Sequence, residues 1–394
     1  MLCRNGVFRR HSCKVVYMCF FAAQPSAKKR ASGNVRGTKM HIYRKEFLFI
    51  KEDKMGKYLI KRVLYIVLVF FILSLMLFLI YNMLPVDKAA AKATEEVKAS
   101  KGALNYQERY EFWQKKYGTN GTKLERYGRW IGIYPYADGS FKGILQGNLG
   151  DSAVYGKPVA EVIKDPMKNT IFINIFATVL ALGITIPLGI FCAVKRGSKR
   201  DVAVQVGTII GYSLPTFIIA IVFIWLFAVI LGWFPVSGMI TAGSIEWSPW
   251  RQFWDKMYHL ALPLLVMTFC SLGGMTRYVR ASMIEALSMD CIRTARAKGL
   301  REHVVIYSHA WRNALLPIIT LVIGWFLGIF SGSLMIENIF ALNGIGRTYF
   351  QALTNNDNEI VLALQMFYIF ISLAGNLLID IIYGFVDPRI RVNK

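Results

Sequence analysis

A series of long apolar stretches, separated by polar and basic segments, constrains this chain more than any other feature. A helix needs about 20 mostly apolar residues to cross the hydrocarbon core of a bilayer. Six stretches qualify, and they are residues 63–84, 170–194, 207–231, 259–275, 314–334 and 361–386. The sequence therefore predicts an all-α integral membrane protein with six transmembrane helices.

The composition excludes two other classes of protein. The chain has 394 residues, is 55% hydrophobic and carries a net charge of +23, which fits neither an ordinary soluble domain nor a disordered chain. A nucleic-acid-binding protein would gather its basic residues on one soluble face. Here they gather at the ends of the apolar stretches, where they act as signals of membrane topology.

The distribution of basic residues predicts the orientation of the chain. With six crossings, both termini lie on one side of the membrane, together with the basic connection at residues 195–200. The short loops on the other side, residues 232–258 and 337–360, carry few lysines and arginines. The positive-inside rule therefore places both termini in the cytoplasm.

The apolar stretches also divide the chain into segments. Residues 1–56 form a basic leader, which we expect to be disordered or to precede the true start near Met55. A cleaved signal peptide is disfavoured, because the first transmembrane helix, residues 57–84, has its own basic flank. Residues 85–169 are too long for a simple loop and predict a small exported domain. The remaining core, residues 170–394, contains helices 2–6.

The sequence lacks the motifs of an enzyme. It has no G-x-x-x-x-G-K-[ST] phosphate loop and no H-E-x-x-H pair, and its five histidines and six cysteines follow no metal or disulfide pattern. We therefore expect no catalytic residue, cofactor or metal. Asp380 is the one acid well inside an apolar stretch, and local pairing near the cytoplasmic end is favoured over a proton relay.

Glycines recur at four-residue spacing in the fifth stretch, at Gly324, Gly328 and Gly332. Apolar burial gives no drive between helices in lipid, so small residues that permit close backbone approach mark helix contacts. These glycines predict a packing face for another helix, which belongs either to this chain or to a second one.

The predicted cytoplasmic loop, residues 281–313, holds an unusual basic segment. Asp290 is suited to cap a short helix, and Gly299 is suited to end it in a left-handed conformation. Ile292 and Ala295 share one face with Gly299, at spacings of three and four residues. A helix with such a small face fits a groove on another protein. A basic loop that follows the positive-inside rule or binds anionic lipid fits the pattern equally well.

This segment resembles the cytoplasmic coupling loop of ATP-binding-cassette importer permeases, whose signature is a small-residue triplet, a glycine a few residues on and a later Leu-Pro. Here the triplet position reads Arg293-Thr294-Ala295, the glycine is Gly299 and the Leu-Pro is Leu316-Pro317. The usual Glu-Ala-Ala is altered, and the gap to the proline is longer than in the sugar-importer branch. Both departures resemble the dipeptide/oligopeptide (peptide/nickel) branch.

Further blocks similar to this branch are spread over residues 57–394, and their order and number make the resemblance specific. They are residues 144–163, 186–198, 213–217, 276–287, 337–353 and 387–391. The resemblance implies the type I ABC importer transmembrane-domain fold in a bacterial cell membrane.

The resemblance also implies a function and partners. The chain is expected to form half of a pathway for peptides, with a second, related permease subunit, two ATP-binding ATPase subunits and an extracytoplasmic peptide-binding protein, and without nucleic acid. The expected coupling contact consists of Asp290, Ile292, Arg293, Thr294, Ala295, Arg296, Ala297, Lys298 and Gly299.

Two kinds of alternative stay open at this point. The same architecture can import nickel or another small solute. A self-contained secondary transporter or channel is an alternative of another class, as is a membrane anchor or receptor. A secondary transporter should show ionisable groups in its spans or paired broken helices, and the sequence offers mainly Asp380.

Overall fold

The computed structural model describes residues 60–83, 87–101 and 103–386. Within these residues the regular structure is helical, apart from one isolated bridge between Asp151 and Pro158. The predictions for residues 1–56 and for the block at residues 387–391 lie outside the described residues.

Four helices are each long and apolar enough to cross a membrane. They are Ile60–Tyr81, α6 (Val159–Val194), α9 (Pro249–Leu287) and the Asn358–Ile382 part of α15 (Asn358–Val386). Two broken pairs are further candidates, Lys199–Ser213 with Thr216–Ile230 and Glu302–Leu315 with Pro317–Gly328. The described chain thus has four spans, or up to six if each broken pair crosses once. The prediction of an all-α membrane protein is confirmed.

The third predicted stretch is not one continuous helix. It comprises the end of α7 (Lys199–Ser213), then α8 (Thr216–Phe223) and the π-helix η2 (Ile224–Ile230). The helix breaks at Leu214 and Pro215, because proline has no amide N–H and disfavours helical backbone in the residue before it.

Two helices are longer than the apolar stretches that predicted them. α6 has 36 residues and α9 has 39. At a rise of 1.5 Å per residue they are about 54 and about 58 Å long, whereas the hydrocarbon core is about 30 Å thick. Both helices therefore extend beyond the hydrocarbon core. Residues 281–287, which the sequence assigned to the cytoplasmic loop, belong to α9.

The chain divides into two compact units, which are described separately. Among the described residues, the first contains 60–64, Leu182–Tyr212 and Ser271–Ile323, and so includes the predicted cytoplasmic loop. The second contains those of Tyr65–Ala181, Ser213–Cys270 and 324–386, and so includes most of the predicted exported domain. Short helices of the second unit include α13 (Leu334–Ile339) and α14 (Ile345–Thr354).

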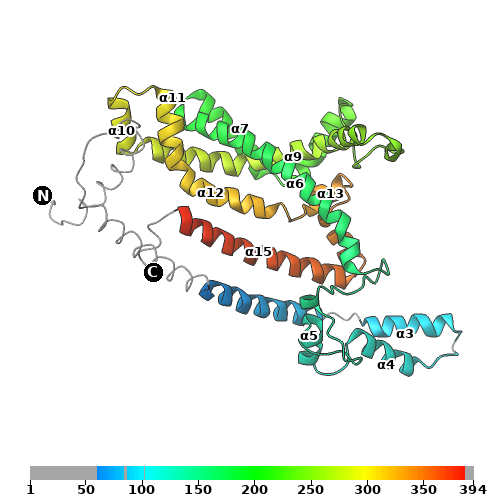
Figure 1. Ribbon diagram of the computed structural model, residues 1–394. Coiled ribbons are helices and arrows are strands. Elements are labelled where there is room, and N and C mark those ends of the chain that lie inside the picture. The colour runs from blue at the N-terminus through cyan, green and yellow to red at the C-terminus, as the bar shows by residue number, and fades with distance from the viewer. Residues whose placement is uncertain (1–59, 84–86, 102, 387–394) are drawn as a thin grey trace, which may run out of the picture. The chain divides into compact units, whose positions relative to one another are not determined.

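The segment between the first helix and α6 is built from three short helices, α3 (Lys88–Ala99), α4 (Tyr106–Tyr117) and α5 (Lys123–Ile131). The Asp87 carboxylate caps α3 by accepting two backbone hydrogen bonds, and Gly118 ends α4 with a φ of 66°. α3 and α4 pack side by side (Figure 1). Local start and stop signals therefore define these helices.

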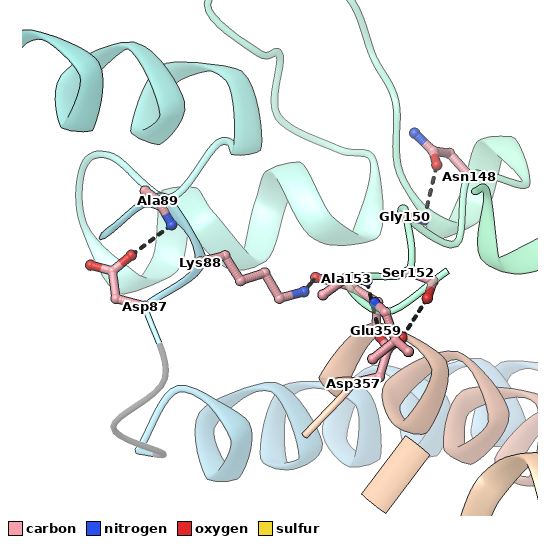
Figure 2. A network of polar contacts seen from close by, with 10 residues as sticks. Asp87, Lys88, Ala89, Asn148, Gly150, Ser152, Ala153, Asp357 and Glu359 are labelled. Carbon is pink, nitrogen blue, oxygen red and sulfur yellow. Dashed lines mark hydrogen bonds and ion pairs between the residues drawn. The ribbon is translucent and has the colours of Figure 1, made fainter. Parts of the chain in front are cut away.

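A network of polar contacts ties this segment to the start of α15 (Figure 2). The Asp357 carboxylate is 1% exposed, and it accepts hydrogen bonds from the Ser152 hydroxyl and from the next two backbone N–H groups, at 3.4 and 3.3 Å. Lys88, the first residue of α3, forms an ion pair with Glu359 in the first turn of α15. The segment is thus attached to α15 at two points.

A second buried polar centre surrounds Glu337 of α13. Its carboxylate accepts hydrogen bonds from the Thr170 hydroxyl (3.0 Å) and from the backbone N–H groups of Ser333 (3.2 Å) and Arg347 (3.1 Å). Because Arg347 lies in the first turn of α14, the carboxylate also caps that helix. Burial raises the pKa of Glu337 above its ordinary value, and the three donors oppose this effect only in part.

Candidate functional site

The helix predicted in the cytoplasmic loop is present as α10 (Asp290–Ala297). The expected cap is wrong, because Met289 occupies the N-cap position and the Asp290 side chain makes no capping hydrogen bond. Asp290 is instead the first helical residue, where a negative charge still favours the helix dipole. The predicted stop is confirmed, since Gly299 has a φ of +76°. Its N–H and that of Leu300 bond back into the helix, as in a Schellman motif.

The small apolar face of α10 is turned into the chain itself. Ile292 and Ala295 are buried, and α10 packs on the π-helix η4 (Val305–Ala310). The sequence led us to expect this face in a groove of another protein. In this structure Ile292 and Ala295 hold the helix in place, so the other residues of α10 are the ones left to contact a partner.

The outward side of α10 carries arginines, and exposed apolar side chains occur in the residues that flank the helix. Arg293 is 76% exposed and lies 3.8 Å from the Asp290 carboxylate, whereas Arg296 makes a two-point ion pair with Glu302. Large exposed apolar side chains are a mark of interaction sites when they gather on one surface. We use the name α10 surface for the exposed arginines of α10 together with the exposed apolar residues that flank it in the sequence, and this set is Met289, Arg293, Arg296, Leu300, Val304 and Tyr307.

A buried ion pair in the same unit joins α7 to α9. Arg280 donates from Nε to Asp201 Oδ1 at 2.8 Å and from Nη2 to Asp201 Oδ2 at 2.7 Å. Asp201 is 1% exposed and also accepts hydrogen bonds from the Gly197 N–H and the Gln205 amide. The carboxylate is therefore fully satisfied. Sequence analysis missed this pair, although Asp201 is the one acid in the basic run at residues 195–201.

Glycines allow the helices of this unit to approach closely. A Cβ atom added at Gly189 of α6 would lie 2.7 Å from Val279 of α9, and one added at Gly273 would lie 2.4 Å from the Thr208 carbonyl oxygen. The close approach at Gly273 thus reinforces the ion pair between α7 and α9, and the one at Gly189 brings α6 against α9.

The predicted glycine stripe behaves differently. Gly324 and Gly328 lie in α12 (Trp311–Gly328), and a Cβ atom added at either would meet no described atom within 4 Å. Gly332 lies beyond the end of the helix, against the backbone of Gly346. A packing role for Gly324 and Gly328 against another chain stays a prediction.

Among the described residues, no group of three or more His, Cys, Asp or Glu side chains is placed to hold a metal ion. Asp380 lies in α15 and takes part in an interaction.

Comparison with known proteins identifies the family. Residues 185–392 match the family described as "Binding-protein-dependent transport system inner membrane component". The chain belongs to this family. It is thus the permease of a binding-protein-dependent ABC importer, embedded in a membrane, and the resemblance stated from its sequence is confirmed.

Several relatives of this permease are named for peptide transport. It is 33% identical over 341 residues to the oligopeptide transport system permease protein AppB of Bacillus subtilis, covering 86% of this chain and 100% of AppB. It is 36% identical over 250 residues to the peptidoglycan transport system permease protein YejB of Agrobacterium fabrum, covering 63% of this chain and 69% of YejB. It is 31% identical to a putative peptide transport system permease protein of Brucella abortus, covering 84% and 98%.

Among solved structures, the permease is similar to a chain of the inward-facing MetNI methionine ABC transporter. The TM-score is 0.43 at 17% sequence identity, and the match covers 56% of this chain and 95% of that chain.

Proposed function

We propose that this chain is the permease subunit of an ATP-driven peptide importer and forms half of the transmembrane pathway with a second, related permease. The cargo is suggested by the relatives of Bacillus subtilis and Brucella abortus, which are named for oligopeptide and peptide transport. An extracytoplasmic binding protein delivers the peptide, in keeping with a binding-protein-dependent family.

The work comes from two separate ATPase subunits, because this chain has no phosphate loop and hydrolyses no ATP itself. The α10 surface is the contact that carries this proposal. It combines the exposed arginines of a helix whose inner face and end are both fixed with exposed apolar side chains of the residues that flank this helix. Nucleotide bound to the ATPases shifts the permease from one conformation to another only if the ATPases contact the two conformations differently. A rigid helix at the contact transmits this difference to the permease.

The nine residues predicted for the coupling contact divide into two roles in this proposal. Ile292 and Ala295 hold α10 in place, and Gly299 shapes its end. Of these nine residues, the six exposed ones touch the ATPase together with the flanking apolar residues of the α10 surface, and they are Asp290, Arg293, Thr294, Arg296, Ala297 and Lys298.

In this proposal the chain has one orientation in the membrane, which labelling of introduced cysteines tests. α10 and both termini lie in the cytoplasm of a bacterial cell, and residues 85–169 lie outside. In a chain whose native cysteines are replaced by serine, Thr294→Cys should react with a membrane-impermeant thiol reagent only after the cells are permeabilised. Ser140→Cys, in the predicted exported domain, should react in intact cells. The opposite pattern would refute the proposal.

Reconstitution tests the function itself. Vesicles that hold this chain with a related permease, two ATPases and a peptide-binding protein should take up labelled peptide only when ATP is supplied on the ATPase side. Ion-driven flux through vesicles with this chain alone would identify a secondary transporter or channel. Uptake of nickel without uptake of peptide would assign another cargo to the same architecture.

A further inference from the structure

Lys256, in the first turns of α9, has an unusual set of neighbours in the second unit. Its ammonium Nζ lies 3.0 Å from Asn169 Oδ1 of α6 and 4.6 Å from the ring centroid of Phe172. Asn169 is held in turn, because its amide donates to the carbonyl oxygen of Asn343 at 2.8 Å. Three segments that are distant in sequence thus fix the lysine and present it next to exposed Asn343.

No acid of the described chain forms an ion pair with Lys256. The neighbouring acid in the sequence, Asp255, is engaged by the Thr241 N–H and hydroxyl at 2.8 and 2.6 Å and lies 3.6 Å from His259 Nδ1. Half-burial removes part of the hydration of this ammonium, and no ion pair offsets the free-energy cost of that lost hydration. An unpaired charge of this kind is a candidate binding group.

The chemistry of the site selects an anion. An ammonium has three N–H donors, and Asn169 accepts from one of them. The face of Phe172 favours the positive charge without using a donor. The remaining donors suit carboxylate or phosphate oxygens, with which hydrogen bonds are strengthened by charge.

The position of Lys256 along α9 separates it from the coupling end. The α10 surface follows the last residue of α9, and about 30 residues lie between Lys256 and that end, which is enough helix to cross the bilayer. Lys256 lies within residues 232–258, the loop that the distribution of basic residues assigns to the outside of the cell, where cargo arrives if the proposed function holds.

We infer that Lys256, oriented by Asn169, binds the C-terminal carboxylate of a peptide that enters the pathway. This inference rests on the proposed function, since it concerns the cargo of the same importer. Every linear peptide with a free C-terminus carries this carboxylate, so the site would recognise the class of cargo and not its sequence.

The test compares two peptides of the same sequence, one with a free C-terminus and one with a C-terminal amide, in vesicles with the complete transporter. Lys256→Gln should raise the KM for the free-acid peptide roughly tenfold, which corresponds to one charge-assisted hydrogen bond. The KM for the amide should not change. Lys256→Arg should retain the discrimination. Lys168→Gln, which removes an exposed lysine that pairs with Asp165, should affect neither peptide.

A second measurement does not depend on uptake of the amidated peptide. An amine-acylating reagent should modify Lys256 more slowly when free-acid peptide is present, with no such protection by the amide and no protection of Lys168. Equal increases in KM for both peptides in Lys256→Gln would overturn the inference. Acylation of Lys256 at a rate that does not depend on the peptide would also overturn it. Protection that follows the content of anionic phospholipid would assign the site to a lipid phosphate and also overturn it. If the wild type takes up neither peptide, the proposed function fails, and not this site alone.

Discussion

Arg280 of α9 holds Asp201 of α7 through two hydrogen bonds, of 2.8 and 2.7 Å, at a position where the carboxylate is 1% exposed. A surface pair contributes little to stability, but breaking a buried pair leaves an uncompensated charge in the protein interior. The pair therefore fixes the spacing of α7 and α9 in the unit that also contains α10.

Loss of one partner of this pair should destabilise the protein strongly. We expect Arg280→Met to lower the free energy of unfolding by about 3 kcal/mol, because Asp201 stays buried without its cation. Thermal unfolding in detergent measures the effect. The double variant Asp201→Arg with Arg280→Asp should recover part of the loss. Lys142→Met, which breaks the exposed pair with Asp138, is the control and should change little. Equal shifts for Arg280→Met and Lys142→Met would contradict this view of the pair.

The end of α10 should tolerate asparagine but not valine. Gly299 has a φ of +76°, and a Cβ atom there would meet no described atom within 4 Å, so any cost comes from the backbone alone. A β-branched residue in this conformation costs about 1–2 kcal/mol, whereas asparagine visits it readily. Gly299→Val should insert into the membrane normally, abolish uptake and weaken co-purification of the ATPases. Gly299→Asn should keep both activities. If valine and asparagine behave alike, the left-handed end of α10 is unimportant for coupling.

The apolar part of the α10 surface should contribute directly to ATPase binding. Leu300→Ala removes an exposed side chain that we expect to be buried in the complex, and we expect roughly tenfold weaker association from the lost burial of about 1.5 kcal/mol or more. Leu124→Ala makes the same chemical change on exposed α5 and should leave the affinity unchanged. Affinity for the purified ATPases is the measurement. An unchanged affinity in Leu300→Ala would remove this surface from the contact.

The contacts between the α3–α5 segment and α15 should differ in strength. Asp357→Ala removes an acceptor that is 1% exposed and leaves the buried Ser152 hydroxyl without its partner, at a cost of about 2 kcal/mol. Lys88→Met breaks a pair whose side chains are 23% and 24% exposed, so we expect a smaller loss. Proteolysis within residues 148–158 should accelerate in the first variant more than in the second. The reverse order would show that the ion pair with Glu359 dominates the attachment.

Glu337 should give the protein a pH-dependent stability of known sign. Burial raises its pKa above the ordinary value of 4.5, so the folded chain binds this proton more tightly than the unfolded chain. The stability from this group is fully present below pH 4.5 and is lost as the pH rises through the folded pKa.

The difference in melting temperature between the wild type and Glu337→Gln isolates this effect. Asp138, whose pKa is lowered by its hydrogen bonds from Lys142 and Ser140, gives a slope of the opposite sign, and this slope cancels in the difference. Gln adds a constant penalty, because its NH2 group faces the N–H groups that the carboxylate accepts. The advantage of the wild type should therefore shrink as the pH rises. A difference that does not depend on pH would contradict the assignment.

Sequence periodicity predicted the apolar helices well, since the length of an apolar stretch is set by the thickness of the bilayer. It predicted their ends less well. α6 and α9 continue into polar sequence because helical hydrogen bonding does not stop where the hydrocarbon does. The break at Pro215 was readable in principle from the missing N–H of proline.

The site was predicted in part. The helix α10 and its glycine end follow from local signals, which act over a few residues. The inward direction of Ile292 and Ala295 does not, because an amphipathic pattern identifies an apolar face without saying what covers it. Asp201, Glu337 and Lys256 were missed for a related reason, as each gains its role from a partner that is distant in sequence.

The interruption at Leu214 and Pro215 restricts the surroundings that this part of the chain can have within a bilayer. The last turn of α7 leaves carbonyl oxygens that no amide of the following residues can reach in regular helical fashion, and such groups are tolerated at membrane depth only inside protein or beside water. Under the proposed pairing with a second permease, protein of the partner or water in the shared pathway would meet this need of the backbone at the break.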